Sequence, residues 1–143
     1  MENTDVSDWF DEYLEAFASA CRGERDTAAL LAYYAVPLLL TTDGGFYALN
    51  TDDQVVGGVG QQVDDLHAAG YGRTEIIGAD VTVLTATSAL YRGTLSRQRD
   101  DGSEISRITA TYLITDGADR ADGADRADGV AGRRISVLAV HSA

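Results

Sequence analysis

Residues 104–114 alternate like a β-strand and carry an arginine, which makes them the segment best suited to bind a ligand. Successive strand residues point to opposite faces, and this puts Arg107, Thr109 and Thr111 on one face. Both faces are otherwise largely apolar, and an arginine there is costly unless it is paired or lines a polar pocket. We therefore predict that Arg107 and Thr109 bind an anionic or carbonyl group of a ligand. The alternative is a structural salt bridge from Arg107 to Glu104 or to an aspartate of a helix.

A histidine and several aromatic side chains are candidates to complete such a pocket. His141 ends the last alternating segment, and histidine is a residue type that can give or take a proton near neutral pH, so it is a candidate acid or base. The alternative is a strand-end histidine without a chemical role. Tyr91 precedes Arg92 on a predicted central strand, and a tyrosine hydroxyl beside an arginine suits a carboxylate or enolate oxygen. Tyr34 and Phe17 complete the predicted lining, with ordinary core packing as the alternative.

The charge of the chain argues against polyanionic partners. There are 23 acidic and 11 basic residues, every basic one an arginine, and the formal net charge is −12. A strongly acidic protein repels nucleic-acid backbones and anionic lipid surfaces, so we expect neither nucleic acid nor membrane as a partner. The amino-terminal residues do not resemble a secretory leader, and no apolar run approaches the length of a membrane span. The expected location is therefore the cytoplasm.

Metal ions and cofactors are not indicated by the sequence. The histidines and Cys21 are scattered without the spacing of metal ligands, and a single cysteine cannot form an intramolecular disulfide. Gly57, Gly58 and Gly60 lie within a helical pattern instead of between a strand and a helix, so they do not predict a phosphate-binding loop. We expect no metal and no cofactor.

Periodicity and capping signals predict mixed α and β elements in a single domain over residues 1–143. Helices are expected over residues 6–22, from residues 26–27 until Pro37, and between a Thr51 cap and Gly70. The predicted strands cover residues 38–42, 46–49, 80–99, 103–115 and 133–141. The unit Gly-Ala-Asp-Arg-Ala-Asp occurs twice within residues 117–129, so we expect a flexible repeat-containing loop over residues 116–132.

This order of elements resembles the nuclear-transport-factor-2-like superfamily, which includes steroid delta-isomerases, SnoaL-like polyketide cyclases, limonene epoxide hydrolases and scytalone dehydratase. The resemblance is carried by residues 9–34, 46–66, 81–97 and 104–141, and the chain looks like a bacterial branch of this group. The resemblance implies an α+β cone in which three N-terminal helices pack on a curved antiparallel sheet around an apolar pocket. It also implies a homodimer formed through the outer face of the sheet.

The chemistry of the isomerases does not carry over residue by residue. The resemblance requires a carboxylate base just after the second helix, where this chain has Thr41 and Thr42, followed by Asp43 in a turn. It requires a protonated aspartate on a central strand, where this chain has Arg107. Tyr13 matches the tyrosine donor of the first helix. Because an arginine in place of an acid reverses the charge, steroid-type isomerisation is not expected.

Three functions stay open at this point. The preferred one is a protein whose pocket binds a small apolar or carboxylate-bearing molecule, with Arg107 as its anchor. The first alternative is a SnoaL-like cofactor-independent isomerase, cyclase or dehydratase, with His141 or Asp43 as the base. An epoxide-hydrolase-like set that uses Asp64 and Asp80 belongs to the same class. The second alternative is a non-catalytic interaction module that acts through dimerisation.

Overall fold

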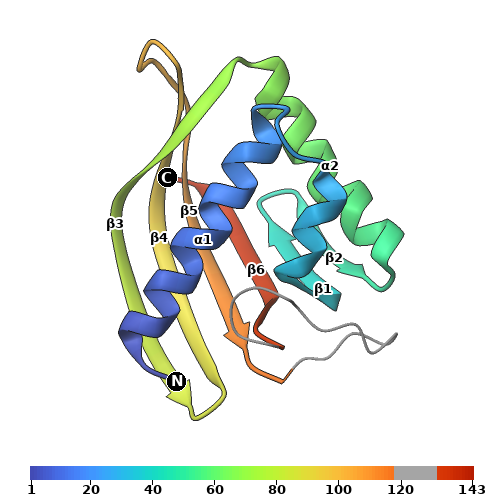
Figure 1. The fold of residues 1–143 in the computed structure, drawn as a ribbon, viewed down its shortest axis with the longest axis vertical. Coiled ribbons are helices and arrows are strands. Elements are labelled where there is room, and N and C mark those ends of the chain that lie inside the picture. Colours follow the sequence, from blue (N-terminus) through green and yellow to red (C-terminus); the bar gives the residue numbers. More distant parts are fainter. Residues whose placement is uncertain (118–131) are drawn as a thin grey trace.

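The helices and the strands form two layers (Figure 1). The computed structural model describes residues 1–117 and 132–143, so the predicted loop at residues 116–132 lies almost wholly outside the described residues. The helical elements are α1 (Asn3–Cys21), the 3₁₀ helix η1 (Thr27–Ala32) and α2 (Asp52–Ala68). The strands are β1 (Tyr34–Thr42), β2 (Gly45–Leu49), β3 (Tyr71–Thr85), β4 (Ser88–Arg99), β5 (Glu104–Thr115) and β6 (Arg134–Ser142).

Both α-helices are amphipathic and turn one stripe of side chains toward the sheet. The buried stripe of α1 recurs at spacings of three and four residues and includes Val6, Phe10, Tyr13 and Phe17. The stripe of α2 follows the same spacing with Val55, Val59, Val63 and Leu66. In the described part of the chain, no helix is long and apolar enough to cross a membrane.

Local hydrogen bonds set the ends of α2. The hydroxyl oxygen of Thr51 accepts from the backbone nitrogen of Gln54 at 3.1 Å, and the side-chain oxygen of Gln54 accepts from the backbone nitrogen of Asn50 at 2.7 Å. The first bond satisfies a backbone donor that the first turn of a helix leaves unpaired, and the second ties the residue before the cap to the same turn. At the other end Gly70 has a φ of +88°, which glycine adopts readily. The predicted bounds of this helix are confirmed.

The sheet has six strands in the order β2-β1-β6-β5-β4-β3. Neighbouring strands are antiparallel except β1 and β6, which run parallel, so the expectation of a wholly antiparallel sheet is corrected at this pair. The parallel pair arises because α2 carries the chain from the β2 edge to the β3 edge, and the strands then return one by one until β6 meets β1. All three helical elements lie on one face of the curved sheet, as expected for a cone (Figure 1).

The second helix is shorter than predicted. It is a 3₁₀ helix that ends at Ala32, and Tyr34 already belongs to β1. Pro37 lies inside β1 instead of terminating a helix. A proline without an N–H is tolerated there because the β1–β6 register shifts between Tyr34 and Leu39, and the pairing of β1 with β2 starts only at Leu38.

The predicted strand at residues 80–99 is in fact two strands joined by a tight turn. β3 ends at Thr85 and β4 begins at Ser88. The turn is held by side chains: the hydroxyl of Thr85 accepts from the backbone nitrogen of Thr87 at 3.1 Å and lies 2.6 Å from the Ser88 hydroxyl. No glycine, proline, asparagine or aspartate marks this turn, which is why the sequence pattern did not indicate it.

Candidate functional site

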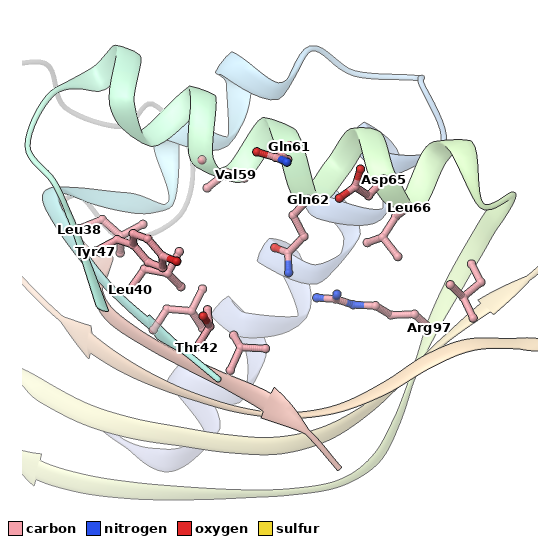
Figure 2. Close-up of a pocket in the computed structure, with 14 residues that line it drawn as sticks. Leu38, Leu40, Thr42, Tyr47, Val59, Gln61, Gln62, Asp65, Leu66 and Arg97 are labelled. Atoms are coloured by element: carbon pink, nitrogen blue, oxygen red, sulfur yellow. The ribbon is translucent and has the colours of Figure 1, made fainter. Parts of the chain in front are cut away.

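A cavity lies between α2 and the strands β1, β2 and β6 (Figure 2). Its volume is about 610 Å³. Fourteen residues line it: Leu38, Leu40, Thr42, Tyr47, Gly58, Val59, Gln61, Gln62, Asp65, Leu66, Arg97, Ile105, Leu138 and Val140. Half of these residues are aliphatic, so the cavity suits an apolar ligand body.

Strand alternation and helix spacing bring these side chains together. Leu38 and Leu40 alternate toward the cavity along β1, and Leu138 and Val140 do the same along β6. Ile105 departs from the alternation of β5. It is an extra residue between two successive cross-strand pairs, because Arg97 pairs with Ser106 while Gln98 pairs with Glu104. This bulge turns Ile105 toward the cavity.

Arg97 on β4 is the basic residue of the cavity lining. Its side chain follows the inward alternation of Tyr91 and Leu95, and the residue is only 8% exposed. Its guanidinium carbon lies 5.6 Å from the centre of the Phe17 ring. The Nε atom is buried without a hydrogen-bond partner, and no carboxylate of residues 1–117 or 132–143 forms an ion pair with it. A buried cation without a counter-charge is costly, so this arginine is suited to receive an anion.

Polar side chains from α2 accompany Arg97 in the lining. Figure 2 shows Gln62 and Arg97 pointing toward one another from opposite sides of the cavity. Gln61 and Asp65 stand on the exposed side of the same helix. Asp65 is the acidic residue of the described lining, and within the described chain its carboxylate has no hydrogen-bond or ion-pair partner. The lining thus combines one cation, one anion and neutral amides.

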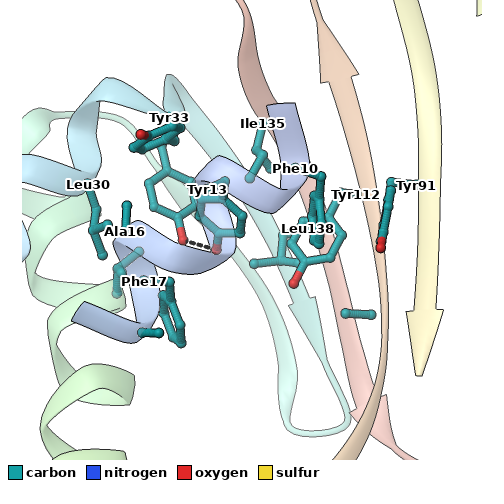
Figure 3. Close-up of a cluster of buried hydrophobic side chains, with 14 of the residues drawn as sticks. Phe10, Tyr13, Ala16, Phe17, Leu30, Tyr33, Tyr91, Tyr112, Ile135 and Leu138 are labelled. Carbon is teal, nitrogen blue, oxygen red and sulfur yellow. Dashed lines mark hydrogen bonds between the residues drawn. The ribbon is translucent and has the colours of Figure 1, made fainter. Parts of the chain in front are cut away.

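The space between α1 and the sheet is filled by an aromatic cluster instead of a pocket (Figure 3). The hydroxyl oxygens of Tyr13 and Tyr34 lie 2.5 Å apart. Tyr91 stacks on Phe10 with ring centres 3.7 Å apart. Burial raises the pKa of Tyr13 and Tyr34 well above the ordinary value and that of Tyr91 to about 12. Tyr13, Tyr34 and Tyr91 are therefore core residues in this structure and do not line the cavity.

Phe17 belongs to the same cluster but has a second contact. The residue is 3% exposed and its ring supports the guanidinium of Arg97. It was predicted to line the pocket, and the structure places it beneath the arginine instead of in the lining. An aromatic face attracts a cation, so Phe17 helps to hold the arginine without touching the cavity itself.

Arg107 and Thr109 lie on the outer face of the sheet, which corrects their expected position. The buried residues of β5 are Ile108, Ala110, Tyr112 and Ile114, and these face the helices. The alternate residues, including Arg107 and Thr109, therefore face away from the cavity. Arg107 is exposed and forms an ion pair with Glu104 at 3.0 Å, the alternative that the sequence offered. The pKa of the Glu104 carboxyl is lowered by a hydrogen bond from Ser96 and by Arg107.

The candidate bases His141 and Asp43 also lie outside the cavity. His141 pairs across the strands with Thr109 on the outer face, and its Nδ1 lies 3.0 Å from the carbonyl oxygen of Ser142. The Asp43 carboxylate accepts from the backbone nitrogen of Ser142 at 3.2 Å. Both side chains are exposed. In residues 1–117 and 132–143, no group of three or more histidine, cysteine or acidic side chains is placed to hold a metal ion.

Arg97 is the site residue that sequence reasoning missed. The signal was present, because Arg97 stands at an even spacing from Tyr91 and Leu95 and so shares their face in a strand. The polar run Arg97, Gln98, Arg99 near a hairpin looks like a solvated strand end. Only the packing of α1 and α2 over this end of β4 makes the residue buried.

Comparison with known proteins identifies the family of the chain. A family model described as NTF2-like protein (DUF6841) matches residues 2–121. No curated protein matches the chain. The resemblance to the nuclear-transport-factor-2-like superfamily is thereby confirmed.

Solved structures share the fold at low sequence identity. A domain of unknown function with a cystatin-like fold from Nostoc punctiforme PCC 73102 is 17% identical with a TM-score of 0.66, over 100% of this chain and 80% of that one. An NTF-2 like protein of unknown function from Shewanella oneidensis MR-1 is 15% identical with a TM-score of 0.63, over 96% of this chain and 99% of that one. A ketosteroid isomerase-like protein from Erwinia carotovora atroseptica SCRI1043 is 18% identical with a TM-score of 0.55, over 91% of this chain and 87% of that one. These likenesses establish the predicted α+β cone and no activity.

Proposed function

The chain belongs to the NTF2-like protein family DUF6841, and from that premise we propose that it binds a small molecule in the cavity beneath α2. The ligand has an apolar body and one anionic or carbonyl group. Its anchor is Arg97, which takes the role that sequence reasoning gave to Arg107. The observation that carries this proposal is the buried guanidinium of Arg97, which has no counter-charge among the described residues.

The dimensions of the cavity support a ligand of modest size. A volume of about 610 Å³ falls within the range of small-molecule sites in proteins. The aliphatic side chains would contribute by removing apolar ligand surface from water. The guanidinium would add charge-assisted hydrogen bonds that fix the orientation of the ligand, and Gln62, which points toward Arg97, would share them (Figure 2).

A cofactor-independent isomerase, cyclase or dehydratase of the SnoaL-like type is the second candidate. The observation that favours it is that Asp65 and Arg97 line one cavity. In such an enzyme Asp65 would act as the base and Arg97 would stabilise the developing oxyanion. We prefer the binding function because the Asp65 side chain is exposed, whereas a catalytic base is usually enclosed and tuned by its surroundings.

The anchor is tested by titrating decanoate and the neutral decanamide into the wild type, Arg97→Met and Arg107→Met, with calorimetry as the measurement. Hydrogen bonds to a charged group contribute about 1.5–3 kcal/mol, so Arg97→Met should weaken decanoate binding about 10- to 100-fold. Decanamide should be affected much less. Arg107→Met removes an exposed arginine of the outer face and should change neither affinity. The proposal would be contradicted if both variants lost the same affinity for decanoate, or if the wild type bound decanamide more tightly than decanoate.

We also propose that two copies of the chain pair through the outer face of the sheet. No helix in the described part of the chain covers this face (Figure 1). It carries Ile77, which is 47% exposed, and a cross-strand pair of Asp80 and Arg92 that a two-fold related copy could complement in charge. Thr111→Glu should place an unpaired charge at the centre of the interface and lower the molar mass measured by light scattering. Glu12→Lys on the helical layer is the control and should leave that mass unchanged.

A further inference from the structure

We infer that Asp65 makes the cavity selective for ligands with a single anionic group and with a neutral hydrogen-bond donor, such as a hydroxyl, at the opposite end. This inference rests on the proposed binding function and adds the class of ligand to it. A ligand of this class is a hydroxylated apolar monocarboxylate, with its carboxylate at Arg97 and its hydroxyl at Asp65.

The first support is the position of Asp65 relative to Arg97. Both residues line the same cavity, but they come from opposite layers: Asp65 from α2 and Arg97 from β4. Arg97 is buried, whereas Asp65 is exposed, so Arg97 stands at the inner end and Asp65 at the solvent end. Aliphatic side chains such as Leu66 and Ile105 line the space as well. A ligand that reaches from the buried guanidinium to the solvent end therefore meets a cation at one end and a carboxylate at the other.

The second support is that no side chain of the described residues occupies the Asp65 carboxylate. Within residues 1–117 and 132–143 it has neither a hydrogen-bond donor nor an ion-pair partner. A carboxylate only accepts hydrogen bonds, so it is suited to a ligand hydroxyl and unsuited to a second ligand carboxylate. Of the described lining residues Arg97 alone is basic.

The charge balance of the cavity turns this geometry into selectivity. One ligand carboxylate neutralises Arg97, after which the lining has no cation left for another. A dicarboxylate would place its second charge next to Asp65, where like charges repel. The repulsion acts near solvent, so added salt should weaken it.

The experiment compares ω-hydroxydecanoate with decanedioate, two ligands of equal chain length, by calorimetry on the wild type, Asp65→Asn and Asp64→Asn. The wild type should bind the hydroxy acid about tenfold or more tightly than the diacid. Asp65→Asn keeps the shape of the side chain and removes its charge, so it should reduce this preference at least about fivefold, mainly by improving diacid binding. Asp64 is an equally exposed neighbour that does not line this cavity, so Asp64→Asn should keep the wild-type preference.

The outcomes separate this inference from the proposed function. Suppose that the wild type binds decanoate, that Arg97→Met does not bind it, and that Asp65→Asn keeps the full preference for the hydroxy acid. Only the inference is then overturned. If Asp64→Asn and Asp65→Asn reduce the preference equally, the effect is one of general charge and the inference is likewise overturned. If the wild type binds none of the carboxylates, the proposed function fails and the inference fails with it.

Discussion

The guanidinium carbon of Arg97 lies 5.6 Å from the centre of the Phe17 ring. This contact joins the two layers of the fold at the cavity, because Phe17 belongs to the buried stripe of α1 and Arg97 to β4. The ring gives the cation a favourable surface without neutralising its charge. The arginine is thus held in place while its charge stays available to a ligand.

Phe17→Leu should weaken carboxylate binding without abolishing it. A cation–π contact at a desolvated site contributes about 1–2 kcal/mol, part of which holds the guanidinium in its position. We expect the affinity for decanoate to fall about 3- to 10-fold and the affinity for decanamide to stay nearly constant.

The matched control for this variant is Phe10→Leu. Phe10 is a fully buried ring of the same helix that stacks on Tyr91, so its removal creates a similar loss of packing. Calorimetry and urea unfolding on both variants separate the effects. If Phe10→Leu reduced decanoate affinity as much as Phe17→Leu did, the contact with Arg97 would have no special role.

Sequence patterns predicted the fold well because most elements follow their own periodicity and caps. The bounds of α2 and β5 came from the Thr51 cap, from Gly70 and from the turn at Asp101 and Gly102. The failures are local. The turn after Thr85 is held by hydroxyl groups that also suit a strand, and Pro37 is tolerated only because β1 is irregular there.

The site was harder to predict because it depends on which face of each strand is covered. Alternation placed Arg107 and Thr109 together correctly, but it could not say that their face is the outer one. That choice is made by α1 and α2, which pack on the opposite face. The same alternation applied to β4 would have placed Arg97 on the same face as the buried Tyr91. Because the turn before β4 was missed, the start of that strand was not predicted.

The buried hydroxyl pair of Tyr13 and Tyr34 should show strong energetic coupling. Removing one hydroxyl leaves the other buried without its partner, and this costs about 1–3 kcal/mol, whereas removing both leaves no unsatisfied group. Tyr13→Phe and Tyr34→Phe should each destabilise the protein, and the double variant should be less destabilised than the sum. Urea unfolding of the four proteins gives the coupling free energy. Simple additivity of the two effects would contradict the hydrogen bond.

Alkaline pH should unfold the protein through the same cluster. Burial raises the pKa of Tyr13 and Tyr112 well above 10.0, so the folded state holds these phenol protons more tightly than the unfolded state does. This contribution to stability is complete below about pH 10 and is lost as the pH rises toward the folded pKa values. The free energy of unfolding should therefore fall as the pH rises above about 10. The free energy of unfolding of Tyr112→Phe should fall less steeply with pH than that of the wild type. An identical slope in the two proteins would show that Tyr112 does not contribute.

Gly57 and Gly58 offer adjacent positions that separate helix stability from cavity shape. A Cβ at Gly57 would meet no atom within 4 Å, so Gly57→Ala should stabilise the protein by about 0.5–1 kcal/mol and leave ligand affinity unchanged. A Cβ at Gly58 would lie 3.1 Å from a methyl carbon of Leu49, and Gly58 lines the cavity. Gly58→Ala should therefore gain less stability, because the leucine must move. Compared with the wild type, Gly58→Ala should also lose more affinity for the bulky naphthylacetate than for the slender decanoate. Equal ligand preference in both variants would show that the bound ligand does not reach this part of α2.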